Sequence, residues 1–479
     1  MSTGVESGSG WLVLLETSAN QRYVFGSNRR RENAGASAVL ARLVGDAVRK
    51  ATAADETLRV LQSISGKAIL IAADEAQGRA VVSTATRHAL AQAPGVELRG
   101  VVVPIGPSLR AAVGQAHQAL EQVRNDVPGP DSRYLRLPVV APCATSGLPA
   151  MDDGRTGDQP DVVSAVTQAK RDAADAFDTS MKDLIKTYGG QSNLAAALFT
   201  DAGDFDRAAD RDTEWSWTAV IHADGNRVGQ TIMAFEGDDD AYAAWLTAFS
   251  AELDDVTHQA FAHAAGSMPK KSILPLILGG DDLTALCRGD RALAFTAAYL
   301  REFGRLASAA EHLKDADSRA ITASAGVAIV KPHFPFHTAY ELAAQLCAAA
   351  KRKHPGEAAL DWHVLYDSSG GDLGTIRGRL PFELWRPYTL DGWDALAADG
   401  AALNATDTDG RRCLPRSQAH ALREALYWPS KAAESALRAI RHRYVQVDWS
   451  RLLGGVDTAP SRPTPRWLDV LDAADFGGA

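Results

Sequence analysis

The residues best suited to chemistry are two adjacent aspartates, Asp281 and Asp282, in the segment SILPLILGGDDLTALCR at residues 272–288. The apolar runs on both sides predict a β-hairpin that carries both carboxylates at its tip. At about 4 Å, two like charges repel by roughly 4 kcal/mol at an effective dielectric constant near 20, so carboxylates in one pocket need a cation or a proton between them. A solvated turn is the simpler interpretation of Gly and Asp alone.

A third carboxylate, Asp224, follows an apolar run at residues 215–223 that predicts a buried strand. If this strand pairs with the hairpin in an antiparallel sheet, Asp224 faces Asp281 and Asp282 at one edge. Three carboxylates there would form an oxygen site suited to Mg²⁺ or Mn²⁺. Two such ions about 3.5 to 4 Å apart can hold a triphosphate and activate a hydroxyl group.

Small and basic residues near these acids could complete a nucleotide site. Gly279 and Gly280 leave room for a base or ribose against the backbone. The turn from Gly225 to Gly229, which includes Asn226, could present N–H groups to phosphate. Lys351 lies near the end of an expected helix at 339–353 and could neutralise phosphates. Cations at a helix C-terminus are equally expected without any ligand.

The elements that must position these residues occur in an order that is found twice. Residues 11–124 and residues 215–353 both predict strand, helix, hairpin, helix, strand and helix. The first strand, at 11–16, is expected to continue through residues 23–25. The repeat predicts an α+β fold with two βαββαβ, ferredoxin-like units. The hairpin of the first unit carries Ser65 and Gly66 at its tip and no acids, so only the second unit has a candidate site.

We expect five segments along the chain. They are a disordered leader at 1–10, the first unit at 11–128, a linker and helical insertion at 129–213, the second unit at 214–372, and a helical C-terminal domain with a flexible tail at 373–479. The basic helix expected at 431–444, with Arg438, Arg441 and Arg443, is most simply a solvated face, and contact with RNA is the alternative.

Composition excludes several classes of protein. A formal net charge of −9 argues against binding nucleic acid through bulk charge alone. The four cysteines are scattered without a CxxC pair, so neither a disulfide framework nor a complete zinc site is indicated. No apolar run is long enough to span a membrane, and the N-terminus lacks the features of a signal peptide, so we expect a cytoplasmic protein without membrane contact.

Four motifs, taken in order, resemble the second palm domain of the large polymerase-like subunit of type III CRISPR effector complexes. They are ADGN after a strand, the GGDD hairpin, the strand SAGVAIV, and the helix end AAAKRK followed by DWHVL. The stretches ETSANQRYVFGSNRRRENAGAS and PCATSGLPA also resemble this family, so the resemblance spans most of residues 11–370. It implies two palm domains related to nucleotidyl cyclases, the first inactive, with a zinc-binding or helical insertion between them and a helical C-terminal domain.

Members with an intact second palm are similar to enzymes that join ATP into cyclic oligoadenylates, the second messengers of antiviral defence. The resemblance implies that Asp224 is the metal ligand after the first strand, that Asp281 is the principal hairpin ligand and that Asp282 is its partner. It further implies that Gly279 and Gly280 lie under the nucleotide, Ser324 near the base or ribose, and Lys351 at the triphosphate.

Three departures from the family pattern change what is expected. Many relatives carry an acid two residues after the first-strand Asp, where this chain has Asn226, which weakens the case for a second metal ion. Cys143 stands in half of a zinc knuckle whose partner cysteines are absent, so we expect no zinc there. No HD nuclease domain is expected before Trp11, so DNA cleavage by that route is not expected.

Three functions fit the sequence. The leading hypothesis is a nucleotidyltransferase or cyclase that uses ATP or another NTP with Mg²⁺ or Mn²⁺, in which the acid-free first palm binds the acceptor nucleotide. The second is a non-catalytic scaffold of an RNA-guided complex that binds only nucleotide or nothing. The third is a stand-alone antiviral cyclase without a guide RNA. The expected partners are the nucleotide and other effector subunits with guide and target RNA.

Overall fold

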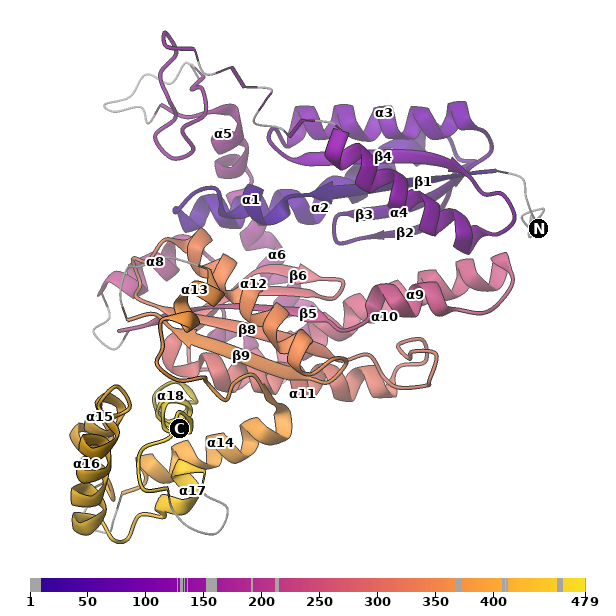
Figure 1. Cartoon of the computed structure of the whole chain (residues 1–479). Coiled ribbons are helices and arrows are strands. Elements are labelled where there is room, and N and C mark those ends of the chain that lie inside the picture. The colour runs from indigo at the N-terminus through magenta and orange to yellow at the C-terminus, as the bar shows by residue number, and fades with distance from the viewer. Residues whose placement is uncertain are drawn as a thin grey trace.

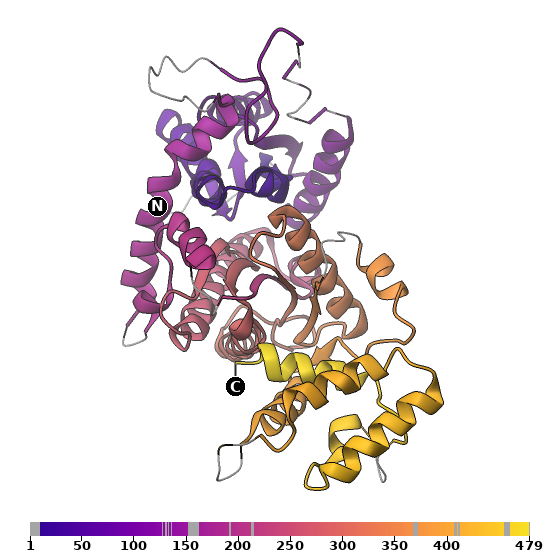
Figure 2. The same ribbon diagram turned by 90° about the vertical axis from the view of Figure 1, so that its left-hand side faces the viewer.

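The computed structural model describes residues 10–126, 128–129, 132, 134–135, 137–151, 162–190, 193–211, 215–366, 372–406, 410, 412–454 and 460–478. Two units of sheet and helices lie one above the other, and a group of C-terminal helices lies beyond the second unit (Figure 1 and Figure 2). The expected leader, except for Gly10, lies outside the described residues. Among the described residues, no helix is long and apolar enough to cross a bilayer.

The first sheet has four strands in the order β2-β3-β1-β4, and each neighbouring pair is antiparallel. Its unit comprises β1 (Trp11–Ser18), α1 (Asn20–Phe25), α2 (Arg30–Ala54), β2 (Arg59–Ile64), β3 (Lys67–Ala72), α3 (Glu75–Gln92), β4 (Glu97–Pro104) and α4 (Leu109–Asp126). Alternate strand residues point to opposite faces, so Val13 and Leu15 pack with α2 and α3, whereas Leu12 and Leu14 pack with α4. The expected continuation of the first strand through residues 23–25 is wrong, because these residues form α1.

The second sheet has six strands in the order β10-β9-β8-β5-β7-β6. Its unit comprises β5 (Thr218–Gly225), α9 (Val228–Ala234), α10 (Asp239–Gly266), β6 (Ile273–Gly279), β7 (Asp282–Arg288), η2 (Gly289–Arg291), α11 (Ala292–Ala309), β8 (Ala323–Val330), α12 (Phe336–Lys353), β9 (Ala359–Val364) and β10 (Tyr388–Thr389). The order β8-β5-β7-β6 repeats the order β4-β1-β3-β2 of the first sheet. The predicted α+β fold with two βαββαβ units is therefore confirmed, and β9 adds a strand parallel to β8.

Helix α10 of the second unit also covers one face of the first sheet. Tyr242 and Leu246 near its N-terminus share a hydrophobic cluster with Leu14 of β1. The hydroxyl of Thr247, the next residue along the helix, donates a hydrogen bond to the carbonyl oxygen of Leu61 on β2 at 2.8 Å. The two units therefore share a continuous core, which fixes how their hairpins face each other.

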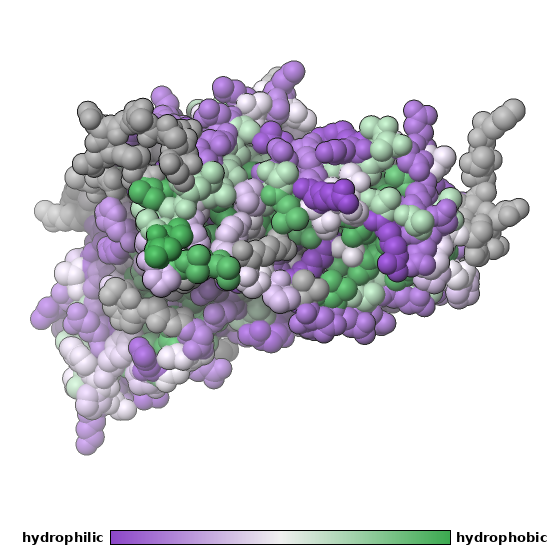
Figure 3. All heavy atoms as spheres, turned by 90° about the horizontal axis from the view of Figure 1, so that it is seen from above, coloured by the Kyte–Doolittle hydropathy of each residue, from purple (hydrophilic) through white to green (hydrophobic). Residues whose placement is uncertain are grey.

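The helices outside the two units lie in an insertion and in the C-terminal region. The insertion contains α5 (Ala165–Asp172), α6 (Ala174–Tyr188), α7 (Leu194–Ala197) and α8 (Ala202–Arg211), and the C-terminal region contains α13 (Leu373–Gly378), α14 (Leu390–Asn404), α15 (Arg416–Ala425), α16 (Ser430–Arg443), α17 (Trp449–Leu453) and α18 (Arg466–Phe476). In the insertion, buried Cys143 has its sulfur 3.3 Å from the hydroxyl of Thr167. The described residues on the outer face of the first unit mix hydrophilic and hydrophobic side chains (Figure 3).

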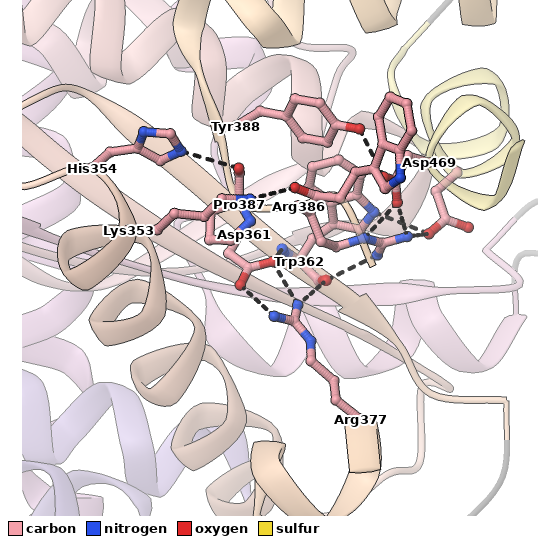
Figure 4. A network of polar contacts seen from close by, with 11 residues as sticks. Lys353, His354, Asp361, Trp362, Arg377, Arg386, Pro387, Tyr388 and Asp469 are labelled. Carbon is pink, nitrogen blue, oxygen red and sulfur yellow. Dashed lines mark hydrogen bonds and ion pairs between the residues drawn. The ribbon is translucent and has the colours of Figure 1, made fainter. Parts of the chain in front are cut away.

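Helix α18, near the C-terminal end of the chain, is buried. Trp467 and Asp469 of this helix are 0% exposed. The guanidinium group of Arg386 donates to the carboxylates of Asp469 and Asp472 at 2.7 Å each, and it lies 4.3 Å from the ring centroid of Trp362 (Figure 4). Residues 386 and 469 are 83 positions apart in the sequence, so this contact depends on the tertiary structure.

Candidate functional site

Antiparallel pairing of β5 with β7 brings the three predicted acids to one edge of the second sheet. The register of the two strands places Asp224 beside Asp282, the first residue of β7. A Cβ atom added to Gly225 would lie 3.0 Å from Oδ2 of Asp281, so the Asp281 side chain lies against the end of β5. The three carboxylates are therefore neighbours, in the arrangement that the strand order predicts.

The electrostatics of this edge favour the arrival of positive charge. Burial, followed by the charge of Asp224, raises the pKa of Asp281 to about 7. Burial and the charges of Asp281 and Asp224 raise the pKa of Asp282 to about 8. The ammonium group of Lys351 binds the carboxylate of Asp224 and donates to the carbonyl oxygen of Gly225 at 2.7 Å. One lysine therefore offsets part of the charge of three crowded acids.

The donor atoms at this edge suit a hard divalent cation. They are carboxylate oxygens and one strand-end carbonyl oxygen, which Mg²⁺ and Mn²⁺ prefer. Within the part of the chain that the structure describes, no three His, Cys, Asp or Glu side chains are placed to hold one metal ion. In this structure the ammonium group of Lys351, and not a metal ion, binds the Asp224 carboxylate and the Gly225 carbonyl oxygen. The residue types fit the cation, and their side chains would have to turn toward it.

The GGDD turn is held by α10 and touches the first unit. The Gly280 N–H donates to Oδ1 of Asp254 at 2.7 Å, and the Gly280 carbonyl oxygen accepts from the hydroxyl of Thr257 at 2.6 Å. Gly279 has φ 155° and Gly280 has φ 61°, which favours glycine at both positions. A Cβ atom on Gly279 would lie 2.8 Å from Oγ of Ser65. The space that we expected a nucleotide to fill is therefore occupied on this side by the acid-free hairpin.

Two other predicted site residues are structural in this conformation. The Asn226 amide nitrogen donates to the hydroxyl of Thr322 at 2.8 Å and to the carbonyl oxygen of Glu357 at 2.9 Å. The hydroxyl of Ser324, which is 0% exposed, donates to Oδ1 of Asn226 at 3.2 Å. The expected contact of Ser324 with a base or ribose is not available here, because its hydroxyl faces this buried network. The network joins the end of β5 to β8 and to the loop before β9.

A cavity of about 560 Å³ lies between α1 of the first unit and α12 of the second. Gln21 and Phe25 line it from α1, and Tyr340 lines it from α12. The Tyr340 ring lies 5.5 Å from the ring of His222, which stands on β5 two residues before Asp224. Burial and then the charge of Asp282 raise the pKa of Tyr340. The cavity therefore adjoins the acidic edge. It could not be predicted from the sequence, because residues 23–25 were expected to continue the first strand and instead belong to α1.

Comparisons with known proteins agree with the arrangement of the two units. Residues 217–359 match the family model of the second palm domain of Cas10/Cmr2. A Csm1-Csm4 cassette in complex with cA4 has a similar structure, with a TM-score of 0.61, 13% sequence identity, and coverage of 98% of this chain and 70% of that chain. The cassette in complex with one ATP has a TM-score of 0.60 and 14% identity over 98% of this chain and 70% of that chain.

Csm1 of T. onnurineus is similar as well, with a TM-score of 0.60 and 15% identity over 97% of this chain and 70% of that chain. No curated protein sequence matches the chain significantly. The described fold and the matched segment agree with the resemblance drawn from the GGDD hairpin and its neighbouring motifs. Residues 217–359 therefore match the second palm domain of Cas10/Cmr2, within a chain whose fold is similar to that of Csm1.

Proposed function

We propose that this chain binds nucleoside triphosphates, ATP foremost, and joins them into cyclic oligonucleotides as the large subunit of a type III CRISPR complex. The observation that carries the proposal is the convergence of Asp224, Asp281 and Asp282 with Lys351 at an edge that adjoins the cavity between the two units. Structures of the related Csm1-Csm4 cassette in complex with one ATP, with pppApApA and with cA4 support this assignment.

The proposed reaction joins the 3′-hydroxyl oxygen of one nucleotide to the α-phosphorus of the next. The bond between that phosphorus and the bridging oxygen of the β-phosphate breaks, pyrophosphate leaves with the bonding electrons, and the hydroxyl proton passes to water. Asp224, Asp281 and Asp282 would hold Mg²⁺ or Mn²⁺, which supplies positive charge for the triphosphate and lowers the pKa of the attacking hydroxyl. When the triphosphate binds, the ammonium group of Lys351 would leave the Asp224 carboxylate and bind a phosphate oxygen.

The two palms would have different tasks. The second palm carries all of the acids, so it would bind the triphosphate that reacts. The first palm contributes Gln21 and Phe25 to the cavity, and an aromatic side chain beside a polar one suits a nucleobase. It would therefore seat the acceptor nucleotide, with Ser65 holding the acidic hairpin in register.

A non-catalytic scaffold that only binds nucleotide is the second candidate. The observation that favours it is the ion pair of Lys351 with Asp224, together with the absence of a metal-binding arrangement among the described residues. Asn226 also favours it, since this position supplies no carboxylate. The two candidates differ in whether the acidic edge forms a phosphodiester bond.

Product formation separates them. The purified protein is incubated with each labelled NTP and Mg²⁺ or Mn²⁺, alone and with the other effector subunits, guide RNA and target RNA. Wild type is expected to form cyclic products and Asp281→Ala/Asp282→Ala to form none. The matched control Glu121→Ala/Asp183→Ala removes two exposed carboxylates elsewhere and should leave the yield unchanged. Absence of product under every condition, with folded protein, would contradict catalysis, and product without RNA would indicate a stand-alone cyclase.

A further inference from the structure

A second cavity lies in the C-terminal part of the molecule, away from the acidic edge. It has a volume of about 240 Å³ between the end of β9, the segment after α13, and α15. Ile376 and Leu468 form part of its apolar lining, and the rings of Tyr366 and Tyr427 border it. Tyr427 is 51% exposed and Tyr366 is 49% exposed. The cavity is therefore a pocket with apolar and charged walls, in which both tyrosine side chains are partly exposed to solvent.

Arginine side chains give this pocket a positive rim. The guanidinium group of Arg423 lies 3.8 Å from the ring centroid of Tyr366. Arg379 also lines the pocket and is exposed, without a hydrogen bond or ion pair to any described residue. Arg386 stands in the wall, but its charge is taken up by Asp469 and Asp472 (Figure 4). Arg379 and Arg423 therefore provide the charge that is available to a ligand.

The pocket opens at the start of a basic helix. Tyr427 lies in the turn between α15 and α16, three residues before Ser430. Residues 412–443 contain seven Lys and Arg against two Glu, in a chain whose formal net charge is −9. On α16, Lys431 and Arg438 are seven residues apart and so lie on one face. Both are exposed, and neither is paired with any described residue.

We propose that the pocket and this face of α16 bind a single strand of nucleic acid. One base enters the pocket against Tyr366 and Tyr427, and the phosphates follow Lys431 and Arg438. Base stacking on aromatic rings and arginine planes is the recognition mode of single strands, since the bases of a duplex are stacked within it. The exposed Trp428 beside Tyr427 adds a further stacking surface. This proposal is independent of the carboxylates, and the chemistry is common to RNA and DNA.

Fluorescence anisotropy of the whole protein with a labelled 20-nucleotide strand tests the proposal, with separate RNA, DNA and duplex arms. Tyr427→Ala should weaken binding about tenfold without changing its salt dependence, because a stacked base is lost. Lys431→Ala/Arg438→Ala should weaken binding and lower the slope of log Kd against log salt by about 1.4, which corresponds to two phosphate contacts. The matched control Lys50→Ala/Arg87→Ala, on exposed cations of the first unit, should bind as wild type does.

Each outcome has a defined meaning. Preference for RNA over DNA identifies RNA as the strand, and equal binding identifies any single strand; both support the site. Wild-type affinity in Tyr427→Ala and in Lys431→Ala/Arg438→Ala would overturn it, as would tighter binding of duplex. Stronger competition by polyglutamate than by unlabelled single strand would also overturn it, because an acidic protein surface would then be the ligand. No binding by wild type would overturn it outright.

Discussion

A single added methyl group tests whether the two hairpin tips touch. Gly280 in the acidic hairpin has φ 61°, and a Cβ atom there would lie 3.0 Å from Oγ and 3.3 Å from Cβ of Ser65. Gly106 has the same φ of 61°, with no atom within 4 Å of an added Cβ. Alanine at either position costs about 1 to 2 kcal/mol for the left-handed backbone. Only Gly280→Ala also meets Ser65, which adds about 1 kcal/mol.

The free energy of unfolding in urea, measured by tryptophan fluorescence, checks this difference. Gly280→Ala should destabilise the protein by about 1 kcal/mol more than Gly106→Ala, and Ser65→Gly should remove that excess, giving a coupling of about 1 kcal/mol in a double-mutant cycle. If Gly280→Ala lowers the free energy of unfolding equally with Ser65 present and with Ser65→Gly, the contact between Gly280 and Ser65 is refuted. The acidic edge would then not be built against the first palm.

Two further substitutions probe buried polar groups. Arg386→Met should lower the free energy of unfolding by about 3 to 5 kcal/mol, because it leaves the buried carboxylates of Asp469 and Asp472 without their cation. Adding Asp469→Asn and Asp472→Asn should restore most of the lost stability. If thermal unfolding shows that Arg386→Met lowers the stability by less than about 1 kcal/mol, the pairing is contradicted. Asn226→Asp should lower the free energy of unfolding by about 1 to 3 kcal/mol, since a carboxylate would face the carbonyl oxygen of Glu357. If the substitution instead raises the affinity for Mn²⁺, this position serves the metal.

Local pattern and strand order were sufficient to predict the acidic edge. Alternating and continuous apolar runs mark the strands of a hairpin, and antiparallel pairing then leaves Asp224 with no place other than beside Asp282. The same reasoning gave the repeat of two units, because the order of elements is a property of the chain. The positions of the domain boundaries stay predictions.

Contacts between distant segments could not be predicted in this way. Ser65 meets the GGDD turn because α10 packs under the first sheet, and no local pattern encodes that packing. Arg386 pairs with Asp469 of α18 although 83 positions separate them in the sequence. Ser324 shares its strand with the site, but its hydroxyl bonds Asn226 instead of facing a ligand. Side-chain partners in the tertiary structure decide each of these cases.

We propose above all that the acidic edge of the second palm holds a metal-bound nucleotide. Anomalous scattering from Mn²⁺, in crystals of the protein with a non-hydrolysable ATP analogue, tests it most directly. We expect a Mn²⁺ peak bounded by carboxylate oxygens of Asp224, Asp281 and Asp282, with the Lys351 ammonium group moved from Asp224 to a phosphate oxygen. An ordered nucleotide without a peak at this edge, or with Lys351 still paired with Asp224, would contradict it.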